Sequence, residues 1–206
     1  KKDSLPNEFV AICDWNTIGL IGRDDGIVTS YEKNQNLGNL VFNIQNAQQN
    51  EGAGGFWGIG KTIFYRMSQA GLVIFYSRIR KENGEYEERL TSVLVEDEQK
   101  QSDCFLSEPD YIGISFYGKN QRQPDGGQTR TIIIKDHDFC RELLNVFGLK
   151  TYQGEKTGTI VIVPFVDGQK VCSQCPEYTQ HENQIIISWA EDFDEYLKTC
   201  ILRWYI

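Results

Sequence analysis

The chain has 206 residues, of which 40% are hydrophobic and 12% aromatic, so it can bury a core and is short enough to form one domain. Its formal net charge of −8, without a run of Lys or Arg, argues against a sequence-independent grip on nucleic acid or on an anionic membrane surface. No segment approaches the roughly 20 apolar residues of a membrane-spanning helix, and the start KKDSLPNEFV lacks the apolar centre of a signal peptide. We therefore expect a soluble, cytoplasmic protein with no direct nucleic acid binding and no membrane partner.

The first part of the sequence predicts a strand, a turn, a long connection and a helix. The apolar run EFVAICDW ends near Asp14, and in the following turn Asn16 tolerates a positive φ while Gly19 allows close backbone approach. Residues 23–55 are polar and rich in Gly, Asn and Gln, which predicts a long, lid-like loop. The glycine-rich stretch GGFWGIGKT then opens a helix, whose apolar residues recur at helical spacing up to a stop at Gly71.

The remainder predicts several strands and two helices. LVIFYSRIR and RLTSVLVED form a hairpin around Asn83-Gly84, and YIGISFYG and TRTIIIKD add shorter strand-like segments. DFCRELLNVFGL is expected to be a helix and the apolar run GTIVIVPFV a buried strand. The sequence predicts an insert or a hairpin at residues 166–188. Residues 189–205 carry an apolar stripe typical of an amphipathic helix that packs on the sheet of its own domain.

The six cysteines are scattered, which does not suggest a disulfide framework. Cys172 and Cys175 form a C-x-x-C pair followed by His181, which is compatible with half of a zinc site or with a redox pair. A zinc knuckle needs four ligands and the sequence has no second C-x-x-C pair, so two unpaired thiols in a surface hairpin are the favoured interpretation. A zinc or redox protein stays open as an alternative.

The stretch GGFWGIGKT fits the phosphate-loop pattern G-x-x-x-x-G-K-[ST], with Gly55, Gly60, Lys61 and Thr62 at the fixed positions. In a P-loop, a hydrophobic strand runs directly into the first glycine and aims the N–H groups of the loop at the phosphates. The preceding residues here, NAQQNEGAG, are too polar for a buried strand. A P-loop NTPase is therefore the less favoured alternative, whereas anion binding by the helix N-terminus and Lys61 is still expected.

Three motifs in chain order resemble those of the GHKL ATPases, the superfamily of DNA gyrase, heat-shock 90-kilodalton chaperones, histidine kinases, MutL and MORC proteins. Asp14, with Asn16 and Gly19, is similar to the first glycine box of the family, although Asn16 stands where glycine is usual. Thr159 matches the final threonine of the nucleotide site, and the resemblance covers most of residues 9–165. The second box, G-x-x-G-x-G, is matched in the style of the chaperone, MutL and MORC branches by Gly55, Gly58 and Gly60.

The resemblance implies an α+β two-layer sandwich, the Bergerat-type ATP-binding fold, with a mixed, mostly antiparallel sheet and helices on one face. It implies that a buried Asp14 carboxylate accepts a hydrogen bond from the adenine amino group, which discriminates against the carbonyl of guanine, and that Thr159 supports this carboxylate. The second box and Lys61 would close over the phosphates, and Mg²⁺ would accompany ATP. Residues 1–206 are thus expected to form a single ATP-binding domain. The expected nucleotide-binding residues are Asp14, Asn16, Gly19, Gly55, Gly58, Gly60, Lys61 and Thr159.

The family also carries an upstream helix with a Glu that activates water and an Asn that holds Mg²⁺, and only thirteen residues precede Asp14 here. We therefore expect the general base to lie upstream of Lys1, and this chain alone to show little or no ATP hydrolysis. In the complete protein, ATP binding and hydrolysis are expected to gate a conformational or dimerisation step that involves other domains, a protein partner or a homodimer. A nucleotide-binding interaction module that does not hydrolyse ATP is the main alternative.

Overall fold

The computed structural model describes residues 5–27, 34–43, 59–96, 104–106, 113–122, 129–173, 178–181, 184–187 and 189–204. The chain divides into two compact units, Lys1–Phe165 and Val166–Ile206, whereas the sequence analysis expected one domain. None of the described helices is long and apolar enough to cross a membrane.

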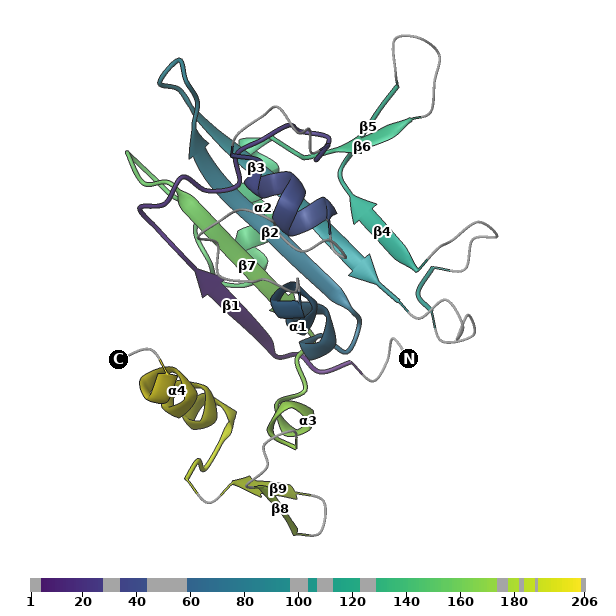
Figure 1. Cartoon of the computed structure of the whole chain (residues 1–206), viewed down its shortest axis with the longest axis vertical. Helices are drawn as coiled ribbons and strands as arrows, with labels where there is room; N and C mark the ends of the chain where they lie inside the picture. Colours follow the sequence, from purple (N-terminus) through teal and green to yellow (C-terminus); the bar gives the residue numbers. More distant parts are fainter. Residues whose placement is uncertain are drawn as a thin grey trace. The chain divides into compact units, whose positions relative to one another are not determined.

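A five-stranded sheet forms the centre of the larger unit (Figure 1), and its described strand pairs are all antiparallel. In spatial order, the strands are β1 (Phe9–Cys13), β7 (Gly158–Pro164), β2 (Leu72–Arg80), β3 (Tyr86–Val95) and β4 (Ile114–Tyr117). A separate two-stranded ladder is formed by β5 (Lys119–Gln121) and β6 (Arg130–Ile132). A late strand, β7, therefore lies beside the first strand of the chain.

The central strands are the ones that the sequence marks by continuous apolar runs. Every residue of β7 is buried, and so is most of β2, because both faces of the sheet are covered at this point. The predicted hairpin is confirmed: β2 pairs with β3 over its whole length, and Gly84 has a φ of 86° in the turn between them.

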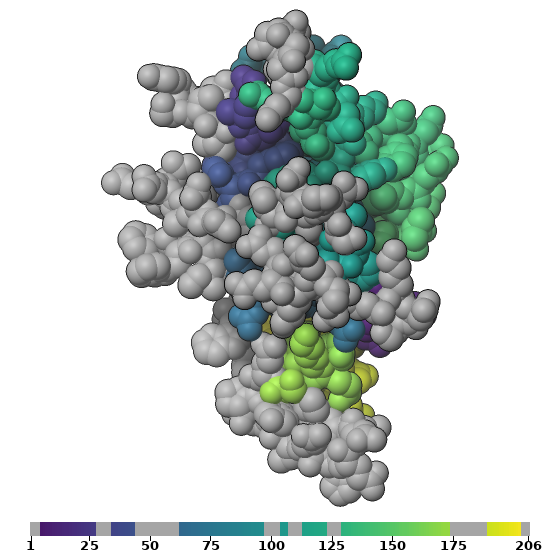
Figure 2. Space-filling view, turned by 90° about the vertical axis from the view of Figure 1, so that its right-hand side faces the viewer, coloured from purple at the N-terminus to yellow at the C-terminus, as the bar shows by residue number. Residues whose placement is uncertain are grey.

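Helices cover both faces of the sheet, so the prediction of helices on one face is wrong. The described helical segments of this unit are α1 (Ile59–Met67), α2 (His137–Val146) and the π-helical segment η2 (Gly38–Phe42). Successive strand residues point to opposite faces. Phe75 of β2 accordingly packs in one apolar cluster with η2 and α1, and Tyr76 packs in a second cluster with α2. In the space-filling view of Figure 2, the purple-blue residues that include η2 and the green residues that include α2 lie on opposite sides.

We call these two sides the η2 face and the α2 face. The broader prediction of a mixed α+β fold with a mostly antiparallel sheet is confirmed. The α2 helix begins with Asp136, whose side chain accepts a hydrogen bond from the N–H of Phe139, and it is followed by Gly148 with a φ of 66°. These are the start and stop signals that the sequence offers for this helix.

Part of the expected lid-like loop, residues 23–55, is folded against the sheet. The apolar side chains of Leu37 and Val41 are completely buried on the η2 face, where η2 forms one helical turn. Residues 28–33 and 44–58 lie outside the described residues, so the lid prediction is untested for them. The expected loop is therefore interrupted by a segment that belongs to the core.

The smaller unit contains α3 (Gly168–Cys172), a hairpin of β8 (Tyr178–His181) and β9 (Gln184–Ile187), and α4 (Phe193–Trp204). The hairpin falls within residues 166–188 and α4 within residues 189–205, where the sequence places them. Cys172 is buried as a small apolar residue would be, and Cys175 lies outside the described residues. The side chains that pack against Cys172 are Trp189, Ala190, Phe193 and Tyr196.

Candidate functional site

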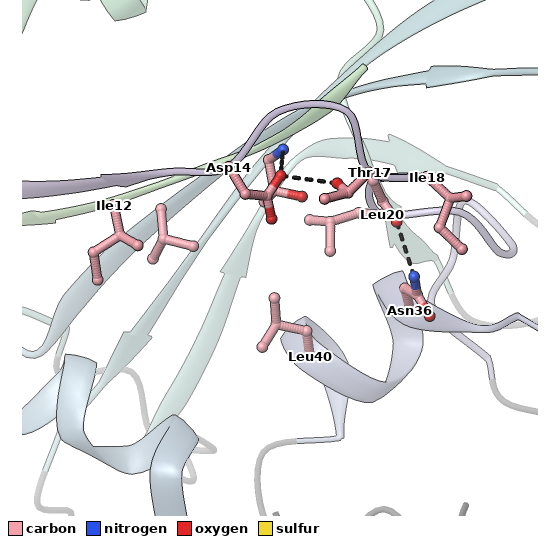
Figure 3. Close-up of a pocket in the computed structure, with 10 residues that line it drawn as sticks. Ile12, Asp14, Thr17, Ile18, Leu20, Asn36 and Leu40 are labelled. Carbon is pink, nitrogen blue, oxygen red and sulfur yellow. Dashed lines mark hydrogen bonds between the residues drawn. The ribbon is translucent and has the colours of Figure 1, made fainter. Parts of the chain in front are cut away.

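A cavity of about 320 Å³ opens on the η2 face, between the loop that follows β1, the start of β7 and the η2 segment (Figure 3). This volume falls at the lower end of the range for small-molecule sites, roughly 300–1,000 Å³. The apolar lining residues are Ile12, Ile18, Leu20, Leu40 and Val161. The remaining lining residues are Asp14, Thr17, Gly19, Asn36 and Thr159. An apolar enclosure with a few polar groups is the usual composition of a site for a small organic ligand.

Asp14 and Thr159 meet where the ladder between β1 and β7 ends. Ile12 pairs with Val161, and because side chains alternate, Asp14 and Thr159 lie on the same face as this pair. The N–H of Asp14 donates to the Thr159 carbonyl at 2.9 Å, in continuation of the ladder. The N–H of Thr159, however, donates to Oδ1 of Asp14 at 2.6 Å. The Asp14 side chain thus takes the place of a main-chain acceptor and is fixed to β7.

The two carboxylate oxygens of Asp14 have different environments. Oδ1 accepts from the Thr159 N–H and from the Thr17 hydroxyl, the latter at 2.9 Å, whereas no described residue donates to Oδ2. Asp14 is exposed, which corrects the expectation of a buried carboxylate. One oxygen therefore sets the orientation of the group, and the other is available to a ligand in the cavity.

Thr159 supports Asp14 through its main chain, whereas the resemblance implies support by the side chain. Only 6% of the residue is exposed, and it lines the cavity. None of the described residues hydrogen-bonds with its hydroxyl. The hydroxyl is therefore a second polar group that a ligand, or a water bound to it, can use. The preceding Gly158 is required here, since an added Cβ would collide with the carbonyl oxygen of Asp14.

The turn after Asp14 has the backbone that the sequence predicts. Asn16 has a φ of 62° and Gly19 a φ of 69°, both in the left-handed region. A Cβ at Gly19 would lie 2.5 Å from the hydroxyl oxygen of Ser77, so only glycine fits this close approach to β2. Gly19 lines the cavity, whereas Asn16 shapes the turn and is not among the described lining residues.

Two buried polar side chains from the sheet hold the same loop, and sequence reasoning missed both. Ser77 of β2 is completely buried; its hydroxyl accepts from the Leu20 N–H at 2.9 Å and donates to the Gly158 carbonyl at 2.7 Å. Arg89 of β3 donates to the carbonyls of Leu20 at 3.0 Å and Gly22 at 2.8 Å. The available signal was a serine and an arginine within strands that are otherwise buried. Buried polar groups need hydrogen-bond partners, so each side chain had to bond to some other segment.

The second predicted box is only partly within the described residues. Gly55 and Gly58 lie outside them, whereas Gly60 and Lys61 lie in the first turn of α1. Through Tyr65, α1 packs into the same apolar cluster as Leu20 and Val161, two residues that line the cavity. The first N–H groups of a helix have no partner within the helix, so a helix N-terminus in general favours an anion.

Tyr152 contacts the main chain of Asp14 and Thr159 from the α2 face. The hydroxyl of Tyr152 donates to the carbonyl of Asp14 and lies 3.2 Å from the carbonyl of Thr159. Burial, and secondarily the nearby Cys13 and Asp14, raise the pKa of the Tyr152 hydroxyl above its ordinary value. The hydroxyl therefore stays protonated at neutral pH and acts as a donor.

Among the described residues, no group of three or more His, Cys, Asp and Glu side chains is arranged to hold a metal ion. Comparisons with protein-family profiles, with curated proteins and with solved structures found no match for the chain. The geometry of the cavity is therefore the basis for a functional assignment.

Proposed function

We propose that the larger unit binds ATP and takes the adenine ring into the cavity beside Asp14. The observation that carries the proposal is the Asp14 carboxylate, whose Oδ1 is fixed by two donors and whose Oδ2 has none among the described residues. The amino group of adenine is a donor, whereas guanine has a carbonyl acceptor at that position. A carboxylate fixed in this way favours the first base and repels the second, and the apolar walls suit a flat ring.

The N-terminus of α1 supports the phosphate end of the proposal. Gly60 and Lys61 lie in the first turn of this helix, where main-chain N–H groups have no partner within the helix, and the sequence adds the charge of Lys61. Mg²⁺ would arrive with ATP, held by phosphate oxygens and water. On this proposal, the ring and the phosphates occupy the same face of the sheet.

The meeting of Asp14 and Thr159 at neighbouring strand ends is what a resemblance to the GHKL ATPases predicts, and we propose the Bergerat-type fold for the larger unit on that basis. The α2 helix on the opposite face departs from a two-layer arrangement. In a complete protein, ATP binding would gate a conformational or dimerisation step, as the resemblance implies, in the cytoplasm.

Binding rather than hydrolysis is the property that we propose for this chain. Asp14 is the one ionisable residue among the described residues that line the cavity, and its carboxylate is committed to the base. Turnover would require a general base from outside the described lining of the cavity. ATP hydrolysis by this chain alone, abolished by Asp14→Asn, would contradict this part of the proposal.

Calorimetric titration with ATP, ADP, GTP and ITP tests the base assignment directly. ATP and ADP should bind more tightly than GTP and ITP by roughly 10-fold or more, since a hydrogen bond to a charged group contributes ~1.5–3 kcal/mol. Equal affinities for ATP and GTP would remove Asp14 from this role. ITP is the sharper comparison, because it differs from ATP only at the amino position and its neighbour on the ring.

Asp14→Asn separates the ligand role from the structural one. The donors from Thr17 and Thr159 keep the amide oxygen on their side, so the amide NH₂ replaces Oδ2 and meets the adenine amino group as a second donor. ATP affinity should fall by roughly 10- to 100-fold, whereas ITP affinity should rise, because the amide NH₂ donates to its carbonyl. Thr62→Ala is the control and should change ATP affinity little. If Thr62→Ala abolishes Mg²⁺-dependent binding and Asp14→Asn does not, the P-loop alternative is right.

A further inference from the structure

The Tyr152 hydroxyl connects the two strands at the point where the proposed adenine-binding groups meet. Its ring packs in the apolar cluster of the α2 face, opposite the cavity. Its single proton is shared between the carbonyl oxygens of Asp14 and Thr159, which belong to the ends of β1 and β7. The residue thus reaches the main chain of both cavity residues without lining the cavity.

A chain of polar groups on the α2 face holds Tyr152 in place. The N–H of Tyr152 donates to the hydroxyl of Tyr76 at 3.1 Å, and this hydroxyl donates to Oε1 of Glu88 at 3.0 Å. Oε2 of Glu88 lies 2.7 Å from Nδ1 of His137 at the start of α2. Tyr76 is completely buried and Glu88 is only 8% exposed, so this series of hydrogen bonds is anchored in the core. A satisfied polar network of this kind specifies one arrangement of its members.

We infer that Tyr152 is a positioning residue for adenine recognition, an inference that rests on the proposed function. The carbonyl of Asp14 belongs to the peptide that leads into the turn, and the hydroxyl of Tyr152 fixes the plane of this peptide. Without the hydroxyl, the peptide plane can rotate, and the carboxylate shifts relative to the cavity. Because hydrogen bonding to a base is strongly directional, a small shift of Oδ2 weakens ATP more than a nucleotide that does not use it.

A purely structural role for Tyr152 predicts a different result. It would lower the free energy of unfolding and would reduce the folded population for every ligand alike, so that ATP and ITP lose affinity to the same extent. A positioning role lowers the preference for ATP over ITP. The ratio of the two dissociation constants therefore separates the two roles.

Tyr152→Phe is the test, since it removes only the hydroxyl. The full chain and the variant are titrated with Mg²⁺-ATP and with Mg²⁺-ITP. The dissociation constant for ATP should rise roughly 3- to 10-fold while that for ITP is unchanged. Tyr117→Phe is the matched control, because the same change at this exposed residue of β4 should alter neither constant. If Tyr152→Phe does not fold by circular dichroism, Tyr76→Phe removes the acceptor for the Tyr152 N–H and should shift the ratio in the same direction.

An unchanged ratio in the folded variants overturns the inference and leaves the proposed function intact. A wild-type chain that binds ATP no better than ITP overturns the proposed function, and the inference with it, before any variant is made. A reduced ratio with unchanged ITP affinity supports both.

Discussion

Each face of the sheet carries a cavity, and the two cavities differ in their lining. On the α2 face, Cys140 and Leu144 of the helix are completely buried against the sheet. On the η2 face, the η2 segment leaves a cavity of about 320 Å³ beside the ends of β1 and β7 (Figure 3). The α2 face also carries a cavity, of about 410 Å³, but its lining is mostly charged or polar and includes Arg78, Lys81, Glu88 and His137. The cavity on the η2 face, with its apolar walls, is the one that suits a flat organic ring.

The two faces also differ in how their polar groups are partnered. On the α2 face, the hydroxyl of Tyr76 bonds to Glu88 and to the main chain, and Glu88 also contacts His137. On the η2 face, Oδ2 of Asp14 and the hydroxyl of Thr159 have no partner among the described residues. Polar groups that complete one another stabilise a core, whereas polar groups left open in an apolar cavity are the usual means of ligand recognition.

The largest expected effect is the loss of packing on the α2 face. Leu144→Ala should lower the free energy of unfolding by ~2–5 kcal/mol, because it opens a void at a completely buried position. ATP affinity of the folded fraction should be unchanged.

Leu40→Ala on the η2 face is the counterpart. Leu40 lines the existing cavity, so we expect a smaller loss of stability together with weaker ATP binding. Urea unfolding measures the stability and calorimetry the ATP affinity, and equal losses of both in the two variants would contradict the proposed difference between the faces.

Ser77→Ala should affect both properties, because Ser77 joins the loop after β1 to the start of β7. The change leaves the Leu20 N–H and the Gly158 carbonyl without their partner, which costs ~1–3 kcal/mol of stability. The free energy of ATP binding should become less favourable by a similar amount. Urea unfolding and calorimetry on one preparation measure the two losses. Ser77→Cys is the control for volume and should lie between Ser77→Ala and the wild type, and full ATP affinity in Ser77→Ala would show that the cavity does not depend on this link.

Lys61→Ala tests where the phosphates bind on the η2 face. Lys61 lies in the first turn of α1, and its proposed partner is the terminal phosphate. ATP affinity should therefore fall by roughly 3- to 10-fold and ADP affinity by less, with no loss of stability. Calorimetry with both nucleotides measures the difference, and an equal loss for ATP and ADP would move the lysine away from the terminal phosphate.

The smallest expected effect concerns an ion pair beside the loop of the η2 face. The hydrogen bonds from Arg23, chiefly, hold the pKa of Asp25 below its ordinary value of 3.8. A carboxyl whose pKa is lowered by folding stabilises the protein above pH 3.8, and this contribution is lost as the pH falls through the lower folded value. Asp25→Asn should therefore cost ~0.2–1 kcal/mol near neutral pH and nothing in strong acid. Urea unfolding of both proteins across this range measures the difference, and a gap that persists in acid would contradict the assignment.

Local signals in the sequence predicted the elements well. LVIFYSRIR forms β2 at the expected bounds, since its apolar run and the Asn83-Gly84 turn act within a few residues. The stop at Gly71 follows α1, with a φ of 72°. The meeting of Asp14 and Thr159 was expected from a resemblance of motifs and not from local pattern, because the two residues are 145 positions apart.

The missed features depend on contacts between distant segments. Ser77 bonds to a residue 57 positions away, Arg89 to one 69 away and Tyr152 to one 138 away. Nothing in the neighbouring sequence shows which loop such a side chain will face. The placement of α2 on the opposite face was missed for the same reason, since helical periodicity predicts that a helix has an apolar side but not which face of the sheet receives it.

A crystal structure of the chain with Mg²⁺ and a non-hydrolysable ATP analogue would locate the bound nucleotide. We expect the adenine ring in the cavity of Figure 3, with its amino nitrogen ~2.7–3.2 Å from Oδ2 of Asp14 and the bond from the Thr159 N–H to Oδ1 kept. The phosphates should extend toward the N-terminus of α1. An adenine ring bound elsewhere, or phosphate groups next to Asp14, would contradict the proposed function.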